Sequence, residues 1–433
     1  MNINELITNL EAREGKRKSY DFRRMRALLN ELDNPHRGLK YLHVAGTNGK
    51  GSTSNFLYNI LKSGGYKVGL YTSPHLERYN ERIKINDVEI SDEDFVSFAE
   101  KVFIAEKNIE NNFEQLTFFE FITAICFMYF KREQCEYCVL EVGMGGLSDS
   151  TNVIDKEDTL ACLITPVSMD HTQFLGNNIT EIAYQKSGII KEGVDVFSSN
   201  TDPEVIKVLK EVSLTKNADF FDLNNIDIKN IDIADYGCTY DLIFNCEELK
   251  NIKINLVGYY QMYNSALSVM TILQLRREKK IDISNEAILD GLANTFWAGR
   301  MEKIYNNPQI VLDGAHNFDG IINLTKNFKL YEYNKLYIIA SILNDKEHDK
   351  MLNELAKYAD EIILTGLHTK RKTDLEILQA EASKSSVSVY IIEDLKSAIR
   401  TAKDKATDKD LIIISGSLYL VSETKEIIND ILD

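Results

Sequence analysis

Basic residues are in the minority in this 433-residue sequence: 50 lysines and arginines stand against 66 aspartates and glutamates, which gives a formal net charge of −16. A protein that binds nucleic acid presents a dense basic face, and no Lys/Arg cluster here is longer than a few residues. We therefore expect no nucleic-acid partner. An anionic substrate must be bound by individual cations against the overall field, and Lys50, Lys186 and Arg300 are candidates for that task.

Long apolar segments are also missing. The longest, Leu116 to Phe130, is short for a membrane span and contains Glu120. The first residues, MNINELITNLEAREGKRKS, contain no hydrophobic segment typical of an export signal. The sequence therefore predicts no membrane partner, and a cytoplasmic location is the simplest expectation.

Cysteines are few and scattered. Of the six, only Cys135 and Cys138 form a C-x-x-C pair, and Cys138 enters an apolar run. A zinc site of the finger type requires a second pair at a suitable spacing. Buried thiols are therefore favoured over a metal or redox site.

The chain is too long for one ordinary hydrophobic core, so two domains are expected. Apolar residues make up 44% and charged residues 27% of the sequence, which is typical of a globular protein. We place the joint near Trp297, which divides residues 1–296 from residues 297–433. A monomer is the simplest expectation for the oligomeric state.

The most informative stretch is HVAGTNGKGST, from His43 to Thr53. An apolar run (41–45) precedes it and a helix-like segment (52–62) follows, so the glycines lie where a strand turns into a helix. Backbone N–H groups at a helix N-terminus attract an anion, glycine permits close approach, and Lys50 adds a positive charge. The sequence therefore predicts a phosphate-binding loop.

The strict phosphate-loop pattern, G-x-x-x-x-G-K-[ST], is not matched. Val44 stands at the first glycine position, and Gly51 separates Lys50 from Ser52. A glycine-rich turn with a solvated lysine is the alternative interpretation.

Two other strand ends carry polar side chains. The run YCVLEV (137–142) is typical of a buried parallel strand, and it ends with Glu141 before a glycine-rich turn. A carboxylate at the carboxyl end of such a strand lies where α/β sheets bind ligands, which makes Glu141 a plausible magnesium ligand. His171 follows the next predicted strand (159–165); a lone histidine there is more often a packed or capping residue.

Two helix starts have alternative interpretations. Thr117 and Glu120 are spaced as a capping box, which accounts for both residues without any ligand. A short helix is expected from Thr180, its predicted cap, to Gly188, and its Lys186 could simply be a cation near a helix C-terminus.

The pattern changes in the second half of the chain. Short alternating runs in residues 219–257 predict a small peripheral sheet, and residues 258–277 predict a long helix. After Trp297 the chain alternates between strands and amphipathic segments, which predicts a parallel, doubly wound sheet. The strand end LDGAHN brings Asp313 and His316 to another ligand crevice.

Several separated motifs occur in the order expected for one family: GTNGKGST, SPHL, T-x-F-E, D-H-T-x-x-L-G, Q-K-x-G-I-I-K, W-x-G-R, LDGAHN and GSLYLVSE. Together they resemble the folylpolyglutamate synthase/dihydrofolate synthase family of the Mur ligase superfamily across nearly the whole chain. The resemblance implies an α/β protein with an N-terminal P-loop-type ATPase domain and a C-terminal Rossmann-like domain. It also implies ATP-dependent addition of L-glutamate to a folate through an acyl phosphate, with release of ADP and phosphate.

The resemblance also implies roles for individual residues. ATP would be bound by Asn48, Gly49, Lys50, Gly51, Ser52, Asn264, Arg300 and Asp313. Mg²⁺ would be held by Ser73, Glu141 and His171; the folate or dihydropteroate would contact Thr117, Glu120, Asp149 and Ser150; and Lys50, Lys186 and His316 would be catalytic. Lys186 is expected to be carbamylated, because a carboxylate on its long arm is a suitable magnesium ligand.

The chain departs from the family pattern at two places. Where the family has EVGLGGRLDATN this sequence has EVGMGGLSDSTN, so Leu147 replaces an arginine, and Tyr260 stands where the family has the histidine of a His-Gln pair. A phosphate-loop switch protein is the alternative from another functional class. A Mur-type ligase for cell-wall precursors is a further alternative, which the SPHL and T-x-F-E motifs disfavour.

Overall fold

The computed structural model describes residues 1–13 and 22–432, and it divides the chain into two units. The N-terminal unit comprises Met1–Lys229, Asp241–Ile252 and Tyr263–Thr295. The C-terminal unit comprises Asn230–Tyr240, Lys253–Met262 and Phe296–Asp433. The joint near Trp297 stays a prediction about domains, because two earlier segments of the chain group with the C-terminal unit.

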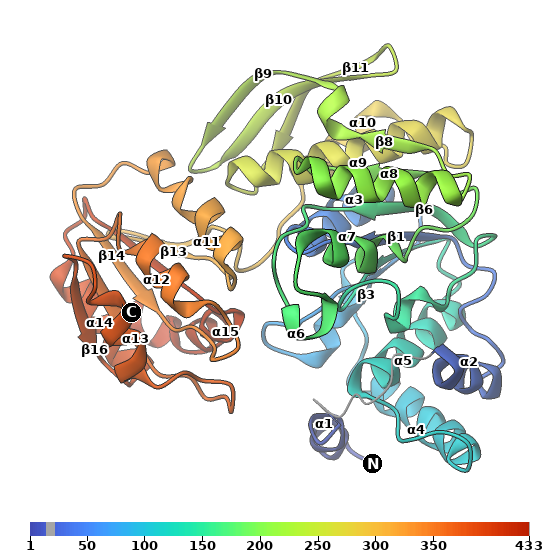
Figure 1. Ribbon diagram of the computed structural model, residues 1–433, viewed down its shortest axis with the longest axis horizontal. Coiled ribbons are helices and arrows are strands. Elements are labelled where there is room, and N and C mark those ends of the chain that lie inside the picture. The colour runs from blue at the N-terminus through green and yellow to red at the C-terminus, as the bar shows by residue number, and fades with distance from the viewer. Residues whose placement is uncertain (14–21, 433) are drawn as a thin grey trace. The chain divides into compact units, whose positions relative to one another are not determined.

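An eight-stranded sheet forms the centre of the N-terminal unit, in the order β4-β3-β2-β5-β1-β6-β7-β8 (Figure 1). Its strands are β1 (Tyr41–Ala45), β2 (Val68–Tyr71), β3 (Ile83–Ile85), β4 (Val88–Glu89), β5 (Tyr137–Glu141), β6 (Thr159–Ile164), β7 (Val196–Ser198) and β8 (Phe220–Asp222). Six of them run parallel, and β3 and β4 form an antiparallel hairpin at the edge. The hairpin turns at Asn86-Asp87, and both residues have positive φ.

The strand order places β1 between β5 and β6, although β2 follows β1 in the chain. The chain therefore leaves the middle of the sheet in both directions. In open α/β sheets, ligands bind beyond the carboxyl ends of the strands at such a switch point. The loops that follow β1, β2, β5 and β6 all leave from this edge.

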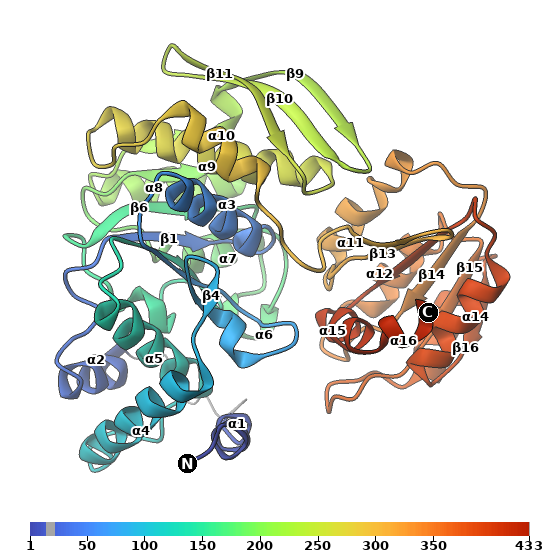
Figure 2. The ribbon, with the colours of Figure 1, turned by 180° about the vertical axis from the view of Figure 1, so that it is seen from behind.

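Helices cover both sides of this sheet. They are α1 (Ile3–Glu11), α2 (Phe22–Glu31), α3 (Lys50–Ser63), α4 (Asp92–Ile109), α5 (Phe118–Arg132), α6 (Thr172–Leu175), α7 (Ile179–Ser187), α8 (Pro203–Thr215), α9 (Tyr259–Arg277) and α10 (Asn285–Ala293). Helices α1, α2, α4 and α5 share one apolar core with the sheet residues Tyr41, Tyr71 and Leu140. Helix α3 packs on β1, β2 and β5 from the other side, and α10 packs on α3 (Figures 1 and 2).

The predicted peripheral sheet is present, with one correction. Strands β9 (Asp227–Ala234), β10 (Gly237–Phe244) and β11 (Glu247–Ile254) form a three-stranded sheet in the order β11-β10-β9. The predicted range of residues 219–257 begins too early, because strand β8 at its start pairs in parallel with β7 of the large sheet. The long helix predicted for residues 258–277 is α9, and its apolar residues Ala266, Val269, Met270 and Leu273 are buried.

A six-stranded sheet forms the centre of the C-terminal unit, in the order β12-β13-β17-β14-β15-β16. Its strands are β12 (Glu302–Asn306), β13 (Gln309–Leu312), β14 (Leu336–Ala340), β15 (Glu361–Leu364), β16 (Ser388–Ile391) and β17 (Leu411–Ser415). The five strands β13 to β17 are parallel, as the predicted doubly wound sheet requires. The edge strand β12, which is antiparallel, was not predicted, because its run alternates weakly and has few apolar residues.

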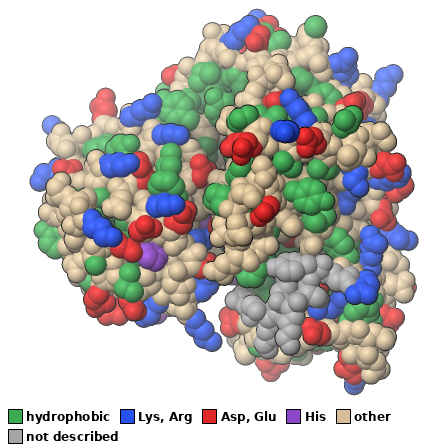
Figure 3. Space-filling model, viewed as in Figure 1, with side chains coloured by type: hydrophobic (Ala, Val, Ile, Leu, Met, Phe, Trp, Pro, Cys, Tyr) green, Lys and Arg blue, Asp and Glu red, His purple; other side chains and the backbone are tan. Residues whose placement is uncertain are grey.

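Helices accompany these strands as α11 (Phe318–Thr325), α12 (His348–Leu355), α13 (Leu375–Ala382), α14 (Leu395–Lys405), α15 (Leu418–Ile427) and α16 (Asn429–Leu432). Helix α12 packs against α11 and α13, whereas α14 packs against α15 and α16. The strand–helix alternation and this grouping agree with the predicted Rossmann-like class. No helix among the described residues is both long and apolar enough to cross a bilayer. On the face drawn in Figure 3, basic and acidic side chains are interspersed.

Candidate active site

The predicted phosphate loop has the expected strand–turn–helix form. Strand β1 ends at Ala45, and α3 begins at Lys50. Gly46 has a φ of +148°, and a Cβ added to it would lie 1.8 Å from Thr165 Oγ1. Only glycine therefore fits where the loop passes the end of β6.

Gly49 ends the loop in the left-handed conformation, with a φ of 86°, and it caps α3 without a side-chain hydrogen bond. A Cβ on Gly49 would lie 2.5 Å from Oδ1 of Asn264, so α9 packs directly on this turn. The N–H groups of Lys50, Gly51 and Ser52 form the first turn of a 14-residue helix. Such groups have no acceptor within their helix, and they form a site for an anion.

Neighbouring segments hold the loop in place. The N–H groups of Thr47 and Asn48 donate to the Pro166 carbonyl at 2.9 and 3.3 Å. The Lys50 Nζ donates to the Thr47 carbonyl at 3.1 Å. Its ammonium group therefore lies over the loop that it was predicted to serve.

Lys186 lies at the same loop and is not a solvated cation. Its Nζ donates to the Gly46 carbonyl at 2.7 Å, and the residue is only 3% exposed. Burial, followed by the charge of Lys50, lowers the pKa of the Lys186 amine to about 7, and Asp170 acts in the opposite direction. Asp170 was not among the predicted site residues, although it immediately precedes His171.

One detail of α7, the helix that carries Lys186, was predicted wrongly. Asn178 caps α7 by accepting from the Glu181 N–H at 2.9 Å. Thr180 lies inside the first turn, and its hydroxyl donates to Asn178 Oδ1 at 2.7 Å. Both residue types can cap a helix, so the position at which the helix starts decides between them.

Two of the three predicted magnesium ligands lie side by side. Glu141, the last residue of β5, is 4% exposed, and its Oε2 accepts the Ser73 N–H at 3.0 Å. A buried carboxylate beside a serine provides the hard oxygen donors that Mg²⁺ prefers. His171 follows β6 at the same edge of the sheet, with a φ of 50° and a side chain that is 38% exposed. In the described parts of the chain, no three His, Cys, Asp or Glu side chains form a ready-made metal cluster.

The glycine-rich turn after β5 is shaped by Asp149. This residue is 1% exposed; its Oδ2 accepts the Met144 N–H at 3.0 Å, and its Oδ1 accepts from the N–H and hydroxyl of Thr151. The Thr151 hydroxyl also bonds to Nε2 of the buried His43 at 2.8 Å. Asp149 therefore fixes the turn, and its neighbour Ser150, at 7% exposed, is also largely buried.

The capping box at the start of α5 is confirmed. The Thr117 hydroxyl accepts the Glu120 N–H at 3.2 Å, and the Glu120 carboxylate accepts the Thr117 N–H at 2.8 Å. Glu120 also forms a buried ion pair with Arg24 of α2 at 2.8 Å. These bonds explain both residues structurally, so neither needs a ligand to account for its position.

Aromatic side chains that sequence analysis missed lie beside these loops. A Cβ on Gly143 would lie 2.6 Å from Phe119 Cζ, so this ring covers the turn that follows β5. The Arg82 guanidinium lies 5.0 Å from the Phe118 ring centroid and donates to His75 Nδ1 at 2.8 Å. Burial and Arg82 together lower the pKa of His75 to about 3.

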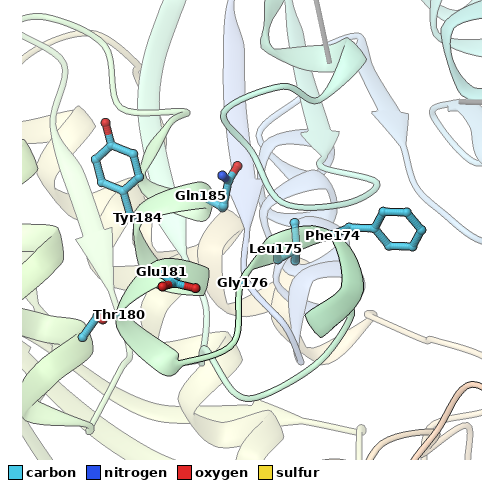
Figure 4. A pocket seen from close by; sticks show the side chains of 7 residues that line it. All are labelled: Phe174, Leu175, Gly176, Thr180, Glu181, Tyr184 and Gln185. Carbon is cyan, nitrogen blue, oxygen red and sulfur yellow. The ribbon is translucent and has the colours of Figure 1, made fainter. Parts of the chain in front are cut away.

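A pocket lies beside α6 and α7 (Figure 4), lined by Phe174, Leu175, Gly176, Thr180, Glu181, Tyr184 and Gln185. The turn after β5 adjoins it, because the Leu147 N–H donates to the Gln185 carbonyl at 2.7 Å and a Cβ on Gly145 would lie 2.9 Å from Leu175. None of the predicted site residues is among the seven that line it. The pocket therefore adjoins the turn after β5, and no residue of the phosphate loop lines it.

The C-terminal unit has its own polar group at a strand end. Asp313 follows β13 and is 3% exposed, and its carboxylate accepts the N–H groups of Met301 and Ala315 at 3.0 and 2.9 Å. Arg300 approaches the same turn, since a Cβ on Gly314 would lie 2.8 Å from its Nη1. His316 is half-buried, and its Nδ1 bonds to the Gly314 carbonyl at 2.9 Å.

Comparison with known proteins agrees with this arrangement over both units. Residues 44–272 match the Mur ligase middle domain, and residues 299–418 match the Mur ligase glutamate ligase domain. The chain is 34% identical over 411 residues to dihydrofolate synthase/folylpolyglutamate synthase of Bacillus subtilis, covering 93% of this chain and 94% of the relative.

Solved structures are similar over almost the full length. Folylpolyglutamate synthase of Mycobacterium tuberculosis complexed with ADP matches with a TM-score of 0.90 at 26% identity, covering 98% of each chain. An FPGS–AMPPCP–folate complex matches with a TM-score of 0.87 at 32% identity, covering 99% of this chain and 100% of the other.

Proposed function

The chain belongs to the folylpolyglutamate synthase/dihydrofolate synthase family of the Mur ligases, and from this membership we propose that it uses ATP to join L-glutamate to the carboxylate of a folate. Members of this family are ATP-dependent ligases, and this chain is one. One observation of the structure carries the proposal. Lys50, Lys186 and the Ser73–Glu141 pair lie at the carboxyl edge of one parallel sheet, around a helix N-terminus suited to phosphate.

The proposed reaction has two steps. A carboxylate oxygen of the folate attacks the γ-phosphorus of ATP, which breaks the bond to ADP and forms an acyl phosphate. The amino group of glutamate then attacks the acyl carbon, loses a proton and displaces phosphate, leaving an amide. Phosphoryl transfer needs alignment and charge neutralisation more than covalent help. We assign these tasks to Lys50, to the first-turn N–H groups of α3 and to Arg300, with Asp313 and His316 also acting on the reactants.

The donor set at the sheet edge fits Mg²⁺. Ser73, Glu141 and His171 would hold it, and when bound it would supply positive charge against the phosphate oxygens. The buried Glu141 carboxylate beside Ser73 is the observation that supports this assignment. Asn264 supports the turn at Gly49, and we place it beside the nucleotide base.

We further propose that Lys186 is carbamylated. Its neutral amine nitrogen would attack carbon dioxide and lose one proton, which forms an N–C bond and a terminal carboxylate. The low pKa supports this step, because an amine with a pKa of about 7 is substantially neutral at physiological pH. Two adjacent ammonium groups at one loop are also unfavourable, and the added carboxylate would reverse the charge of one of them.

We place the folate on the surface formed by the SPHL loop, the start of α5 and the turn after β5. Phe118, Phe119 and Arg82 provide aromatic faces and a cation there. Ser150 is proposed as a direct contact. Thr117, Glu120 and Asp149 would act by holding these segments, since the bonds described above already engage their side-chain oxygens.

Product analysis tests this function and separates the alternatives. The purified protein would be incubated with ATP, glutamate and either dihydropteroate or a reduced folate. The masses of the products would then be measured by mass spectrometry. A gain of one glutamate residue, with ADP formed only when both co-substrates are present, is expected. ADP formation without them would favour a nucleotide switch, and reaction only with a cell-wall precursor would favour another Mur-type ligase. A monomeric state and a cytoplasmic location remain predictions.

A further inference from the structure

Tyr260 contacts the polar group that ends β13. Its hydroxyl donates to Asp313 Oδ2 at 3.3 Å. The same oxygen accepts the Met301 N–H at 3.0 Å, while Oδ1 accepts the Ala315 N–H at 2.9 Å. Both oxygens of this buried carboxylate are thus engaged, and Tyr260 supplies the one side-chain donor among these three bonds.

The bond to Met301 fixes the turn that carries Arg300. Met301 has a φ of 47°, in the left-handed region that is unfavourable for a residue with a Cβ, and Gly299 has a φ of 68°. The Gly314 N–H donates to the Gly299 carbonyl at 2.8 Å, which ties the turn to the end of β13. A strained turn persists only where its surroundings hold it. The Asp313 carboxylate stabilises this turn through the N–H of Met301, the residue that directly follows Arg300.

Tyr260 is itself held firmly. It lies in the first turn of α9, where the neighbouring Tyr259 N–H donates to Asn327 Oδ1 at 3.1 Å. Its ring packs against the core of the C-terminal unit, and a Cβ on Gly258 would lie 2.9 Å from it. Burial, followed by the Asp313 charge, raises the pKa of Tyr260 well above its usual value. The hydroxyl therefore stays protonated and remains a donor to Asp313.

We propose that Tyr260 is a positioning residue that sets the orientation of Arg300 through Asp313 and the Met301 N–H. This inference rests on the proposed function, because it assumes that Arg300 binds the phosphates of ATP. The phenol places its donor at the end of a long, rigid side chain, so it reaches Asp313 directly from the start of α9.

The test is a double-mutant cycle between Tyr260→Phe and Arg300→Ala, with kcat and KM measured for each substrate. Phenylalanine keeps the ring and removes only the hydroxyl. We expect Tyr260→Phe to lower kcat/KM for ATP about tenfold, the effect of losing one hydrogen bond to a charged group, with the KM values for glutamate and folate unchanged. In the Arg300→Ala background, Tyr260→Phe should lower kcat/KM for ATP less than about twofold, because the residue through which Tyr260 acts is absent.

Tyr331→Phe is a matched control. Its hydroxyl is buried in the same core and has no hydrogen-bond partner in the described part of the chain. This variant should keep the parent values. An equal loss from Tyr260→Phe with and without Arg300, or no loss at all in an active parent, would overturn the positioning role. A parent protein that forms no product would instead refute the proposed function.

Discussion

Replacing Lys186 with arginine should abolish ligation, and the structure supplies the size of the effect. The lysine amine has a pKa of about 7, so roughly half of it is neutral at pH 7. An ordinary lysine, with a pKa of about 10.4, is neutral at pH 7 in roughly one molecule in 2,500. Burial therefore raises the reactive fraction about a thousandfold. Arginine occupies the same place but stays charged and forms no carbamate, so we expect a loss of at least about a hundredfold.

The pH dependence has a definite sign. The neutral amine forms as pH rises through about 7, so carbamylation and activity should rise over the same range and fall below it. The folded-state pKa is lower than the unfolded value of about 10.4, so the unfolded chain binds more protons between these limits. The contribution of Lys186 to stability should therefore improve as pH rises through this window in carbon-dioxide-free buffer.

Initial rates of glutamate-dependent ADP formation measure the loss, and ¹³C NMR with labelled bicarbonate detects the carbamate directly. Lys186→Ala should recover part of its activity with added acetate. Lys191→Arg is the matched control, because this lysine also has a pKa lowered by burial but bonds to Asn152 and not to the phosphate loop. An active Lys186→Arg enzyme, alongside an active control, would refute the carbamate.

Three further changes test the other assignments. Lys50→Ala should fold normally but lose at least about a hundredfold in turnover, since a preorganised charge on the phosphoryl group is removed; near-normal rates in a folded variant would remove the phosphate-loop assignment. Asp313→Asn should lower ADP formation at least about tenfold, by weakening the bonds to Met301 and Tyr260, and parent-level kinetics would contradict its role. Leu147→Arg should change the KM for the folate far more than the KM for ATP, and the reverse ranking would show that this turn serves the nucleotide.

Features set by a few adjacent residues could be predicted from the sequence alone. The strand–glycine–helix form of the phosphate loop and the Thr117–Glu120 capping box are both in the structure as expected. Each depends on backbone preferences and on hydrogen bonds within about four residues. The βα alternation of the C-terminal unit was equally visible, because buried parallel strands are apolar throughout. The edge strand β12 has no such signal and was missed.

Only the tertiary structure decided which distant residues meet. Lys186 bonds to Gly46 across 140 positions, and Ser73 bonds to Glu141 across 68. The burial that shifts the Lys186 pKa also comes from segments far from it in the chain. The Tyr260–Asp313 bond has no counterpart in any local pattern. The physical reason is that parallel strands bring their carboxyl ends to one edge whatever their separation in sequence, while side-chain packing there sets each distance and each degree of burial.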